Sequence, residues 1–441
     1  MPVSAPAVAP PAAALVSDTA ASGRTERRRA TRTLAAGATV AVCGLLAWHL
    51  LVKVGYQPGR LTMIYSLVVG TYVVSRFVLA ACYRPPKNAG LEPTVAVIVP
   101  AFNAGEAVVR SIDAILALDY PQAKLEVVCV NDGSTDDTYE LMVAAAARYP
   151  QGAVRCIDLG SNQGKRAAMA AGIRATSAEI LVFVDSDSLP APGAVRLLVQ
   201  GFADPRNGAM AGLTYVRNDR ANMLTKMQAA RYYVSYQLLK SAESVFGAVA
   251  CCSGCFSAYR RDAILPLLDD WEHQTWFGIE CTYGDDRSLT NYVLRAGWRA
   301  RYDSRAEAWT DAPDRYRKFF KQQLRWKKSW VREGPLLLGH LWRTRPAAFP
   351  SALAATMTGL LSPVVVLSHV LYAPLHGVTP LIYGLGLYLV AMGYGLFYRA
   401  LKADSLWLYA VVGTLFYVSF SPQLLWAVAR IKDGSWGTRS A

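Results

Sequence analysis

The chain has 441 residues, 53% of them hydrophobic and 18% charged, and it carries a formal net charge of +14. The length predicts two or three domains, and the low charged fraction argues against a purely soluble protein. Much of the basic excess lies beside apolar segments, which favours a lipid bilayer as the partner. Because the sequence contains no nucleic-acid-binding motif, we expect no nucleic-acid partner.

The amino-terminal segment, residues 1–33, is rich in Ala, Pro and Ser and ends in a cluster of arginines, which predicts a disordered basic tail. Two apolar segments within residues 34–86 predict two transmembrane helices. The first starts late and no small-residue cleavage site closes it, so we favour an uncleaved helix over a signal peptide. The flanking arginines predict that both ends of this helix pair lie in the cytoplasm.

Residues 87–312 have the pattern of a soluble α/β domain. Apolar runs at residues 95–99, 125–130 and 180–184 predict buried parallel strands, and residues 106–118 have helical periodicity. Alternating strands and helices predict a doubly wound, Rossmann-like sheet. Ligands of such sheets bind beyond the carboxyl ends of the strands, and the polar residues at those ends are Asn103, Asp132, Asp185 and Asp187.

Two of these carboxylates belong to the motif Asp185-Ser186-Asp187, which follows an apolar strand. Two carboxylates on one turn can hold Mg²⁺ or Mn²⁺, whose other positions take diphosphate oxygens. Asp132 can accept hydrogen bonds from a base or a ribose, and the alternative for Asn131-Asp132-Gly133 is an Asx-turn.

The basic pair Lys165-Arg166 follows Gly164 but lacks the spacing of a P-loop, which argues against an ATPase. The two cations can neutralise a diphosphate. A solvated helix face is the alternative.

A second acid pair, Asp285-Asp286, follows Gly284. One carboxylate can serve as the base that deprotonates an attacking hydroxyl. The other is better placed for a structural role, paired with Arg287. The alternative is that both residues cap a helix that begins at Arg287.

Residues 313–345 predict amphipathic helices, and residues 219–247 have the same character. Gln322, Arg325 and Trp326 share one helical face, where Trp offers a platform for a sugar ring and Arg a fork for phosphate or carboxylate. Either the membrane interface or the soluble domain can receive these helices, and the sequence leaves both open.

Residues 346–430 predict further transmembrane helices that form a channel, with spans at 350–372 and 378–399 and a third apolar stretch at 406–430. Pro422 interrupts the third stretch, and a proline breaks or kinks a helix. Because residues 431–441 are basic, we predict that the last stretch is broken near Pro422 and returns the tail to the cytoplasm. The eight cysteines fit a reducing compartment.

The combined motifs resemble those of processive family 2 glycosyltransferases, which have a GT-A fold and include cellulose, chitin and hyaluronan synthases. The matching residues are Asn103, Asp132, Asp185-Ser186-Asp187, Gly284-Asp285-Asp286 and Gln322-x-x-Arg325-Trp326, within residues 95–440. The residues around Asp286 and Trp326 and the tail motif Trp436-Gly437-Thr438-Arg439 are most similar to hyaluronan synthases.

The resemblance implies a role for each site residue. Asp185 and Asp187 would hold Mn²⁺ or Mg²⁺ with the UDP diphosphate. The nucleotide side would be formed by Asn103, Asp132, Lys165, Arg166, Trp436 and Arg439, with the last two closing over it. The catalytic side would be formed by Asp286 as the base together with Asp285, Gln322, Arg325 and Trp326. The acceptor sugar would meet Trp326, Ser253, Gly254 and Cys281.

The implied protein is a multi-pass plasma-membrane enzyme with a cytoplasmic GT-A domain embedded in a helical bundle, acting as a monomer. It would polymerise UDP-GlcNAc and UDP-GlcA into hyaluronan and secrete the growing polysaccharide. The chain departs from hyaluronan synthases at Cys255-Phe256, where Pro-Leu is usual. A chitin-type synthase using UDP-GlcNAc alone therefore stays an alternative, beside a non-processive glycolipid transferase and a membrane transporter or scaffold.

Overall fold

The computed structural model describes residues 60–375, 381–402 and 404–433, with a few helical residues between 34 and 48. The basic tail 1–33, much of the first expected membrane helix, and the tail residues Trp436 and Arg439 lie outside the described residues.

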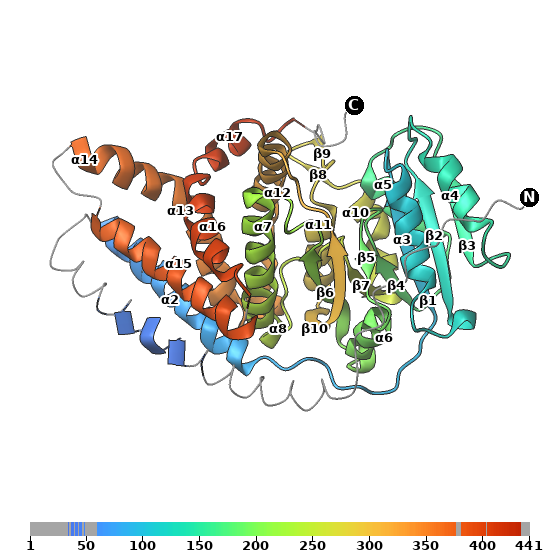
Figure 1. Cartoon of the computed structure of the whole chain (residues 1–441), viewed down its shortest axis with the longest axis horizontal. Helices are drawn as coiled ribbons and strands as arrows, with labels where there is room; N and C mark the ends of the chain where they lie inside the picture. Colours follow the sequence, from blue (N-terminus) through green and yellow to red (C-terminus); the bar gives the residue numbers. More distant parts are fainter. Residues whose placement is uncertain are drawn as a thin grey trace, which may run out of the picture.

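An eight-stranded sheet in the order β3-β2-β1-β4-β7-β6-β10-β5 forms the middle of the α/β domain (Figure 1). Its strands are β1 Val95–Ala101, β2 Leu125–Asn131, β3 Val154–Asp158, β4 Ile180–Phe183, β5 Leu189–Pro190, β6 Asn207–Val216, β7 Ser257–Arg260 and β10 Arg299–Thr310. A separate hairpin pairs β8 Thr275–Trp276 with β9 Ile279–Glu280. The three strands expected from apolar runs are confirmed as β1, β2 and β4.

The sheet is mixed, whereas the strand and helix pattern predicted a doubly wound, Rossmann-like sheet. Strands β3, β2, β1 and β4 are parallel, but β7 runs antiparallel to both β4 and β6. Beyond β7, β10 is again parallel to β6, and β5 is antiparallel to β10. Helices still separate most strands beyond β4, but β7, a short strand after a long helical segment, enters the sheet in the opposite direction.

Helices cover both faces of the sheet. Side chains of β1 alternate between two cores, with Ile98 packed under α5 and Val97 under α3 and α4. The helices of this domain are α3 Glu106–Leu116, α4 Thr138–Ala146, α5 Lys165–Arg174, α6 Ala194–Val199, α8 Ser241–Val245, α9 Arg261–Ile264, α10 Leu268–Glu272 and α11 Asp285–Arg295.

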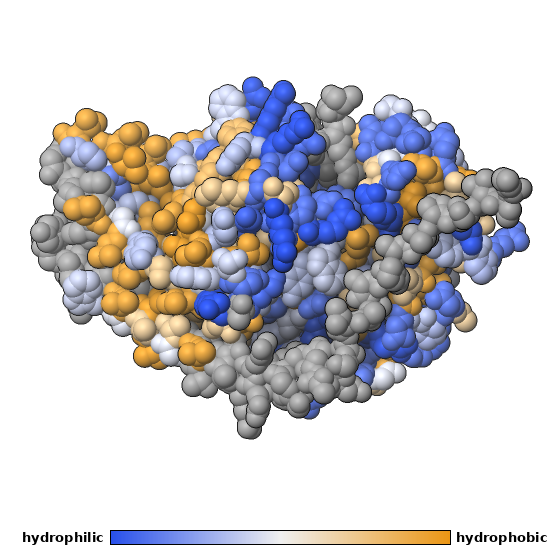
Figure 2. Space-filling view, in the orientation of Figure 1, coloured by the Kyte–Doolittle hydropathy of each residue, from blue (hydrophilic) through white to orange (hydrophobic). Residues whose placement is uncertain are grey.

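Apolar helices gather at one end of the molecule, on the left of Figure 1. They are α2 Arg60–Cys82, α13 Phe349–Leu367 with a π-helical turn to Tyr372, α14 Ala373–Leu375, α15 Leu381–Leu401, α16 Trp407–Ser419 and α17 Gln423–Ala429. Figure 2 shows hydrophobic surface at this end and mainly hydrophilic surface over the middle and right.

Two described helices, Ile64–Cys82 and Phe349–Tyr372, are long and apolar enough to cross a membrane. Taken together, α16 and α17 are also long and apolar enough for a third span, but the two helices meet at a bend of 46° near Pro422. α15 covers the described part of the expected span 378–399, which begins outside the described residues, and is not among these candidates.

Two long helices join the apolar end to the sheet: α7 Met223–Val234, continued by a π-helical segment Ser235–Lys240, and α12 Tyr316–Thr344. Phe319 of α12 is fully buried against Phe416 and Phe420 beside α16. The two amphipathic segments therefore pack inside the molecule, between the apolar helices and the sheet.

A close approach between α12 and α13 depends on a glycine. A Cβ at Gly359 would lie 2.2 Å from Cη2 of Trp330, so a larger side chain must push the helices apart. We expect Gly359→Leu to cost about 1–3 kcal/mol and to lower the thermal unfolding midpoint of the detergent-solubilised protein. Gly339→Ala, with no neighbour within 4 Å, is the control and should leave the midpoint unchanged or slightly higher.

Candidate functional site

The loops that follow β1 and β2 are joined through Asn103. Its φ of 47° is in the left-handed region, which asparagine tolerates better than most residues. The Asn103 N–H donates to the Ser134 hydroxyl at 3.0 Å, and its Oδ1 accepts from the Thr135 N–H at 2.9 Å. Asn103 also lines the main cavity, so it both shapes and borders the expected nucleotide side.

Asp132, just after β2, holds the loop that precedes α5. Its Oδ1 accepts the backbone N–H groups of Gln163 at 2.7 Å and Gly164 at 3.1 Å. Burial raises the pKa of Asp132, and the two N–H donors oppose that rise. The carboxylate thereby fixes the position at which α5 begins with Lys165.

Lys165 forms an ion pair with Asp185, the first acid after β4. Gly254 lies against this pair, because a Cβ there would be 3.0 Å from the Lys165 Nζ and 3.3 Å from Asp185 Oδ1. Asp187 accepts a hydrogen bond from the Thr310 hydroxyl at 3.3 Å, which ties it to the end of β10. Both acids line the cavity.

A divalent metal fits this donor set only together with a ligand. Among the described residues no group of three or more His, Cys, Asp or Glu side chains could hold a metal by itself. Asp185 and Asp187 offer carboxylate oxygens, the ligands that Mg²⁺ and Mn²⁺ prefer, and phosphate oxygens would complete the coordination.

The second acid pair starts α11 after Gly284, whose φ is 79° and whose added Cβ would clash with Ser329. Asp285 turns inward and pairs with Arg166 at 3.2 Å, both side chains being at most 6% exposed. Asp286 borders the cavity, where its Oδ2 accepts the Gly254 N–H at 3.4 Å. Both acids border the cavity, but Asp285 is buried in an ion pair whereas Asp286 is partly exposed.

Two expectations are corrected here. Asp285 pairs with Arg166 and not with the expected Arg287. Arg166 does not border the cavity as a nucleotide contact would; its guanidinium is buried, donates to the Trp271 carbonyl at 2.7 Å and to Gln274 Oε1 at 3.1 Å, and lies over the Trp271 ring.

Gln322, Arg325 and Trp326 border the cavity from α12, as their shared helical face predicts. Trp326 is 40% exposed although it lies inside the molecule, so its ring faces open space. The Tyr232 ring on α7 lies 6.3 Å from the Trp326 ring.

One cavity of about 1730 Å³ connects these groups. It runs from the carboxyl ends of β1, β2 and β4 to residues of α2, α13, α15 and α16, and Ser253 and Gly254 are part of its wall. Cys281 is not. The expectation that it binds an acceptor is corrected, since its side chain is buried in a separate small pocket with Tyr283 and Arg332.

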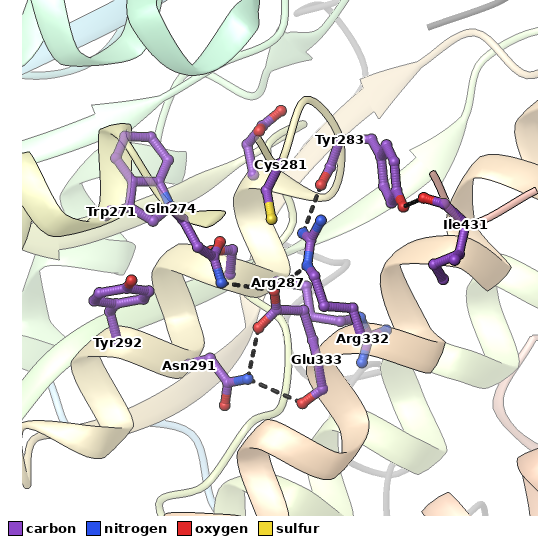
Figure 3. Close-up of polar contacts among 12 residues, drawn as sticks. Trp271, Gln274, Cys281, Tyr283, Arg287, Asn291, Tyr292, Arg332, Glu333 and Ile431 are labelled. Atoms are coloured by element: carbon purple, nitrogen blue, oxygen red, sulfur yellow. Dashed lines mark hydrogen bonds and ion pairs between the residues drawn. The ribbon is translucent and has the colours of Figure 1, made fainter. Parts of the chain in front are cut away.

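Figure 3 shows the polar network that joins α11 to α12 behind the site. The buried Glu333 carboxylate accepts hydrogen bonds from Arg332 Nε at 2.7 Å, Asn291 Nδ2 at 2.8 Å and Gln274 Nε2 at 3.3 Å. Arg332 Nη2 donates to the Tyr283 carbonyl at 2.7 Å. The helix that carries Trp326 is thereby locked to the helix and loop that carry the acid pair.

The same loop contacts the chain beyond α17. The Tyr283 hydroxyl donates to the Ile431 carbonyl at 2.9 Å (Figure 3), and Lys328 Nζ donates to the Asp433 carbonyl at 2.7 Å. The last described residues therefore lie beside the acid loop and α12.

Sequence reasoning missed several residues of the cavity wall. Thr310 ends β10 and Asp311 follows it, much as Asp185 follows β4, so the same signal, a polar residue at the end of a strand, was present. Arg231, Tyr232 and Lys240 on α7 and its extension also border the cavity. No local motif marks them, because they reach the site only through the packing of α7.

Comparison with known proteins finds a matching family model and similar proteins that are all described as sugar-transferring or polysaccharide-synthesising enzymes. A family model described as glycosyltransferase like family 2 matches residues 93–329. A hyaluronan synthase of Streptococcus pyogenes is 30% identical over 383 residues, which is 85% of this chain and 90% of the relative. An N-acetylglucosaminyltransferase of Rhizobium meliloti (strain 1021) is 38% identical over 253 residues, which is 56% of this chain and 59% of the relative.

Among solved structures, a mannosyltransferase from Pyrobaculum calidifontis in complex with GDP-Man and Mn²⁺ has a TM-score of 0.59 and 21% identity. The match covers 91% of this chain and 98% of that chain. This likeness shows a shared GT-A fold.

The different environments of Asp285 and Asp286 predict different effects on stability. Asp285→Asn leaves Arg166 buried without its countercharge, which should cost about 3–5 kcal/mol and lower the thermal midpoint strongly. Asp286→Asn removes a partly exposed charge and should change the free energy of unfolding by less than about 1 kcal/mol. Equal losses in the two variants, measured by thermal unfolding in detergent, would contradict this division.

Proposed function

This chain belongs to glycosyltransferase family 2, and we propose that it is a membrane-integrated, processive, inverting enzyme that polymerises UDP-GlcNAc and UDP-GlcA into hyaluronan. The observation that carries the proposal is the single cavity that borders Asp185, Asp286 and Trp326 and continues between the apolar helices. A polymer made at the sheet can leave through such a cavity without crossing open solvent. The high coverage of a hyaluronan synthase also supports this choice.

The donor binds at the edge of the sheet in this proposal. Asp185 and Asp187 would hold Mn²⁺ or Mg²⁺, which would neutralise the charge of the diphosphate and of the UDP leaving group. Lys165 exchanges its contact with Asp185 for the diphosphate, and Asp132 and Asn103 position the loops around the nucleotide.

Asp286 is the proposed base. Its carboxylate takes the proton from an acceptor hydroxyl, whose oxygen attacks the anomeric carbon from the side opposite the diphosphate. The new glycosidic bond forms as the bond to the UDP oxygen breaks, and the configuration inverts. Asp285 keeps α11 in place through Arg166, so the base stays directed at the cavity.

The acceptor is proposed to lie on Trp326, with Gln322, Arg325, Ser253 and Gly254 around it, all on the cavity wall. A sugar stacked on an aromatic ring can slide by one unit without losing its contact area, which supports processive synthesis.

The membrane arrangement remains part of the proposal. Two helices, or three with the bent pair, are candidate spans beside the described catalytic domain. We propose a multi-pass plasma-membrane protein whose catalytic domain and tail are cytoplasmic. Trp436 and Arg439, outside the described residues, would close over the nucleotide, and the contact of Tyr283 with Ile431 supports a tail that starts beside the acid loop.

A chitin-type synthase that uses UDP-GlcNAc alone is the second candidate. It is favoured by the 38% identity to an N-acetylglucosaminyltransferase and by the departure at Cys255-Phe256, of which Cys255 borders the cavity. The two candidates differ in the donors that they require.

UDP release separates them directly. Purified full-length protein in detergent with Mn²⁺ should release UDP rapidly, and make a hyaluronidase-sensitive polymer, only when UDP-GlcNAc and UDP-GlcA are both present. Polymer from UDP-GlcNAc alone would favour chitin-type synthesis. No release with either donor would reject both.

The base is tested by Asp286→Asn. We expect kcat for UDP release to fall by about 10²–10⁴-fold while the affinity for UDP stays within about twofold of wild type. The matched control is Asp270→Asn, an exposed acid in the first turn of α10 that should leave kcat unchanged. Wild-type turnover in Asp286→Asn would remove this residue from the mechanism.

A further inference from the structure

The far half of the cavity carries cations without acids. Among the described residues, α2, α7, α13, α15 and α16 contain no Asp or Glu. The acids that border the cavity come from the loops at the sheet and from the start of α11: Asp132, Asp185, Asp187, Glu280, Asp285, Asp286, Asp311 and Asp314. The charged side chains that reach into the helix-lined half are therefore basic.

Arg231 of α7 and Lys327 of α12 are two such residues. The Arg231 guanidinium lies 4.0 Å from the centre of the Tyr417 ring, and Lys327 Nζ donates to the Phe420 carbonyl at the bend after α16. Within the described part of the chain, neither forms an ion pair with a carboxylate. Both side chains point to the same bent segment from opposite helices.

Holding these cations together is unfavourable for the free protein. Burial, and then the charge of Arg231, lower the pKa of Lys327 to about 8. An anion placed between the two side chains would offset the burial and the mutual repulsion. The arrangement is therefore better suited to a charged ligand than to an empty or neutral one.

Each cation is next in sequence to an aromatic residue on the same wall. Tyr232 follows Arg231, and Trp326 precedes Lys327, with the two rings 6.3 Å apart. α7 and α12 thus present the same combination, one ring for a sugar face and one cation beside it. An acidic sugar has both complementary parts, an apolar ring face and a carboxylate.

We propose that Arg231 and Lys327 form a carboxylate-binding site for uronic acid units of the product as it leaves the transfer site. The inference rests on the proposed function and deepens it, because the negative charge of the polymer would itself help to keep the polymer bound in the cavity. An anionic lipid headgroup is the competing ligand; the position of the cations on the wall that Trp326 shares favours the glycan.

The test compares two oligosaccharides on full-length protein in detergent. A fluorescent hyaluronan hexasaccharide should bind Arg231→Gln and Lys327→Gln about tenfold more weakly than wild type, as expected for loss of a charge-assisted contact. A chitin hexasaccharide, which has no carboxylate, should change by less than about twofold. Arg231→Lys should restore most of the hyaluronan affinity.

Lys226→Gln is the matched control, since Lys226 is also on α7 and over a tyrosine ring of α16, at 5.4 Å, but does not border the cavity. It should bind both oligosaccharides as wild type does. Equal weakening for both oligosaccharides in Arg231→Gln, or none for hyaluronan, would overturn the proposal.

The lipid alternative is tested in nanodiscs of phosphatidylcholine with and without phosphatidylglycerol. If phosphatidylglycerol displaces the hyaluronan hexasaccharide from wild type but not from Arg231→Gln, the site binds lipid and the proposal fails. The binding measurement does not require turnover. If the protein makes no hyaluronan from UDP-GlcNAc and UDP-GlcA, the proposed function is wrong, but the binding data still show whether Arg231 and Lys327 bind a carboxylate.

Discussion

The first two residues of α5 set the distance between the two acid pairs of the site. Lys165 forms an ion pair with Asp185, and Arg166 forms one with Asp285. One helix turn therefore holds both the acids that follow β4 and the start of α11. Because the Arg166–Asp285 pair is buried, displacing either partner would leave an unpaired charge in the core. The cavity-facing position of Asp286 depends on this constraint.

The mixed sheet also brings site residues together from strands of opposite direction. The parallel strands β1, β2 and β4 end at one edge and place Asn103, Asp132 and Asp185 there. The antiparallel β7 begins where those strands end, so the segment just before it, with Ser253 and Gly254, reaches the same edge from the opposite direction. The Gly254 N–H can therefore donate to Asp286 while its α-carbon borders the Lys165–Asp185 pair.

Local sequence signals predicted which residues of many strand ends and helix faces border the cavity. They failed where a distant part of the chain decides the position of a side chain. A buried apolar run followed by an acid was sufficient for Asp132 and Asp185, and helical spacing was sufficient for Gln322 and Trp326. Asp285 and Asp286 are adjacent and chemically identical, so only the position of Arg166, far away in sequence, decides which one is buried. Cys281 lies three residues before Gly284, yet the turn of the chain directs it to another pocket. The mixed sheet was missed because β7 is only four residues long.

The bend between α16 and α17 also changes the hydrogen bonding of the main chain. A broken helix releases backbone carbonyls from their internal partners, and the Phe420 carbonyl accepts the Lys327 ammonium. A lysine of the cavity wall is thus bonded to a main-chain carbonyl of a candidate membrane span. Spans tilt to match the thickness of the surrounding hydrocarbon. In the proposed membrane arrangement, a thinner or thicker bilayer would shift this carbonyl against α12, so lipid chain length would become a determinant of how firmly the polymer is held.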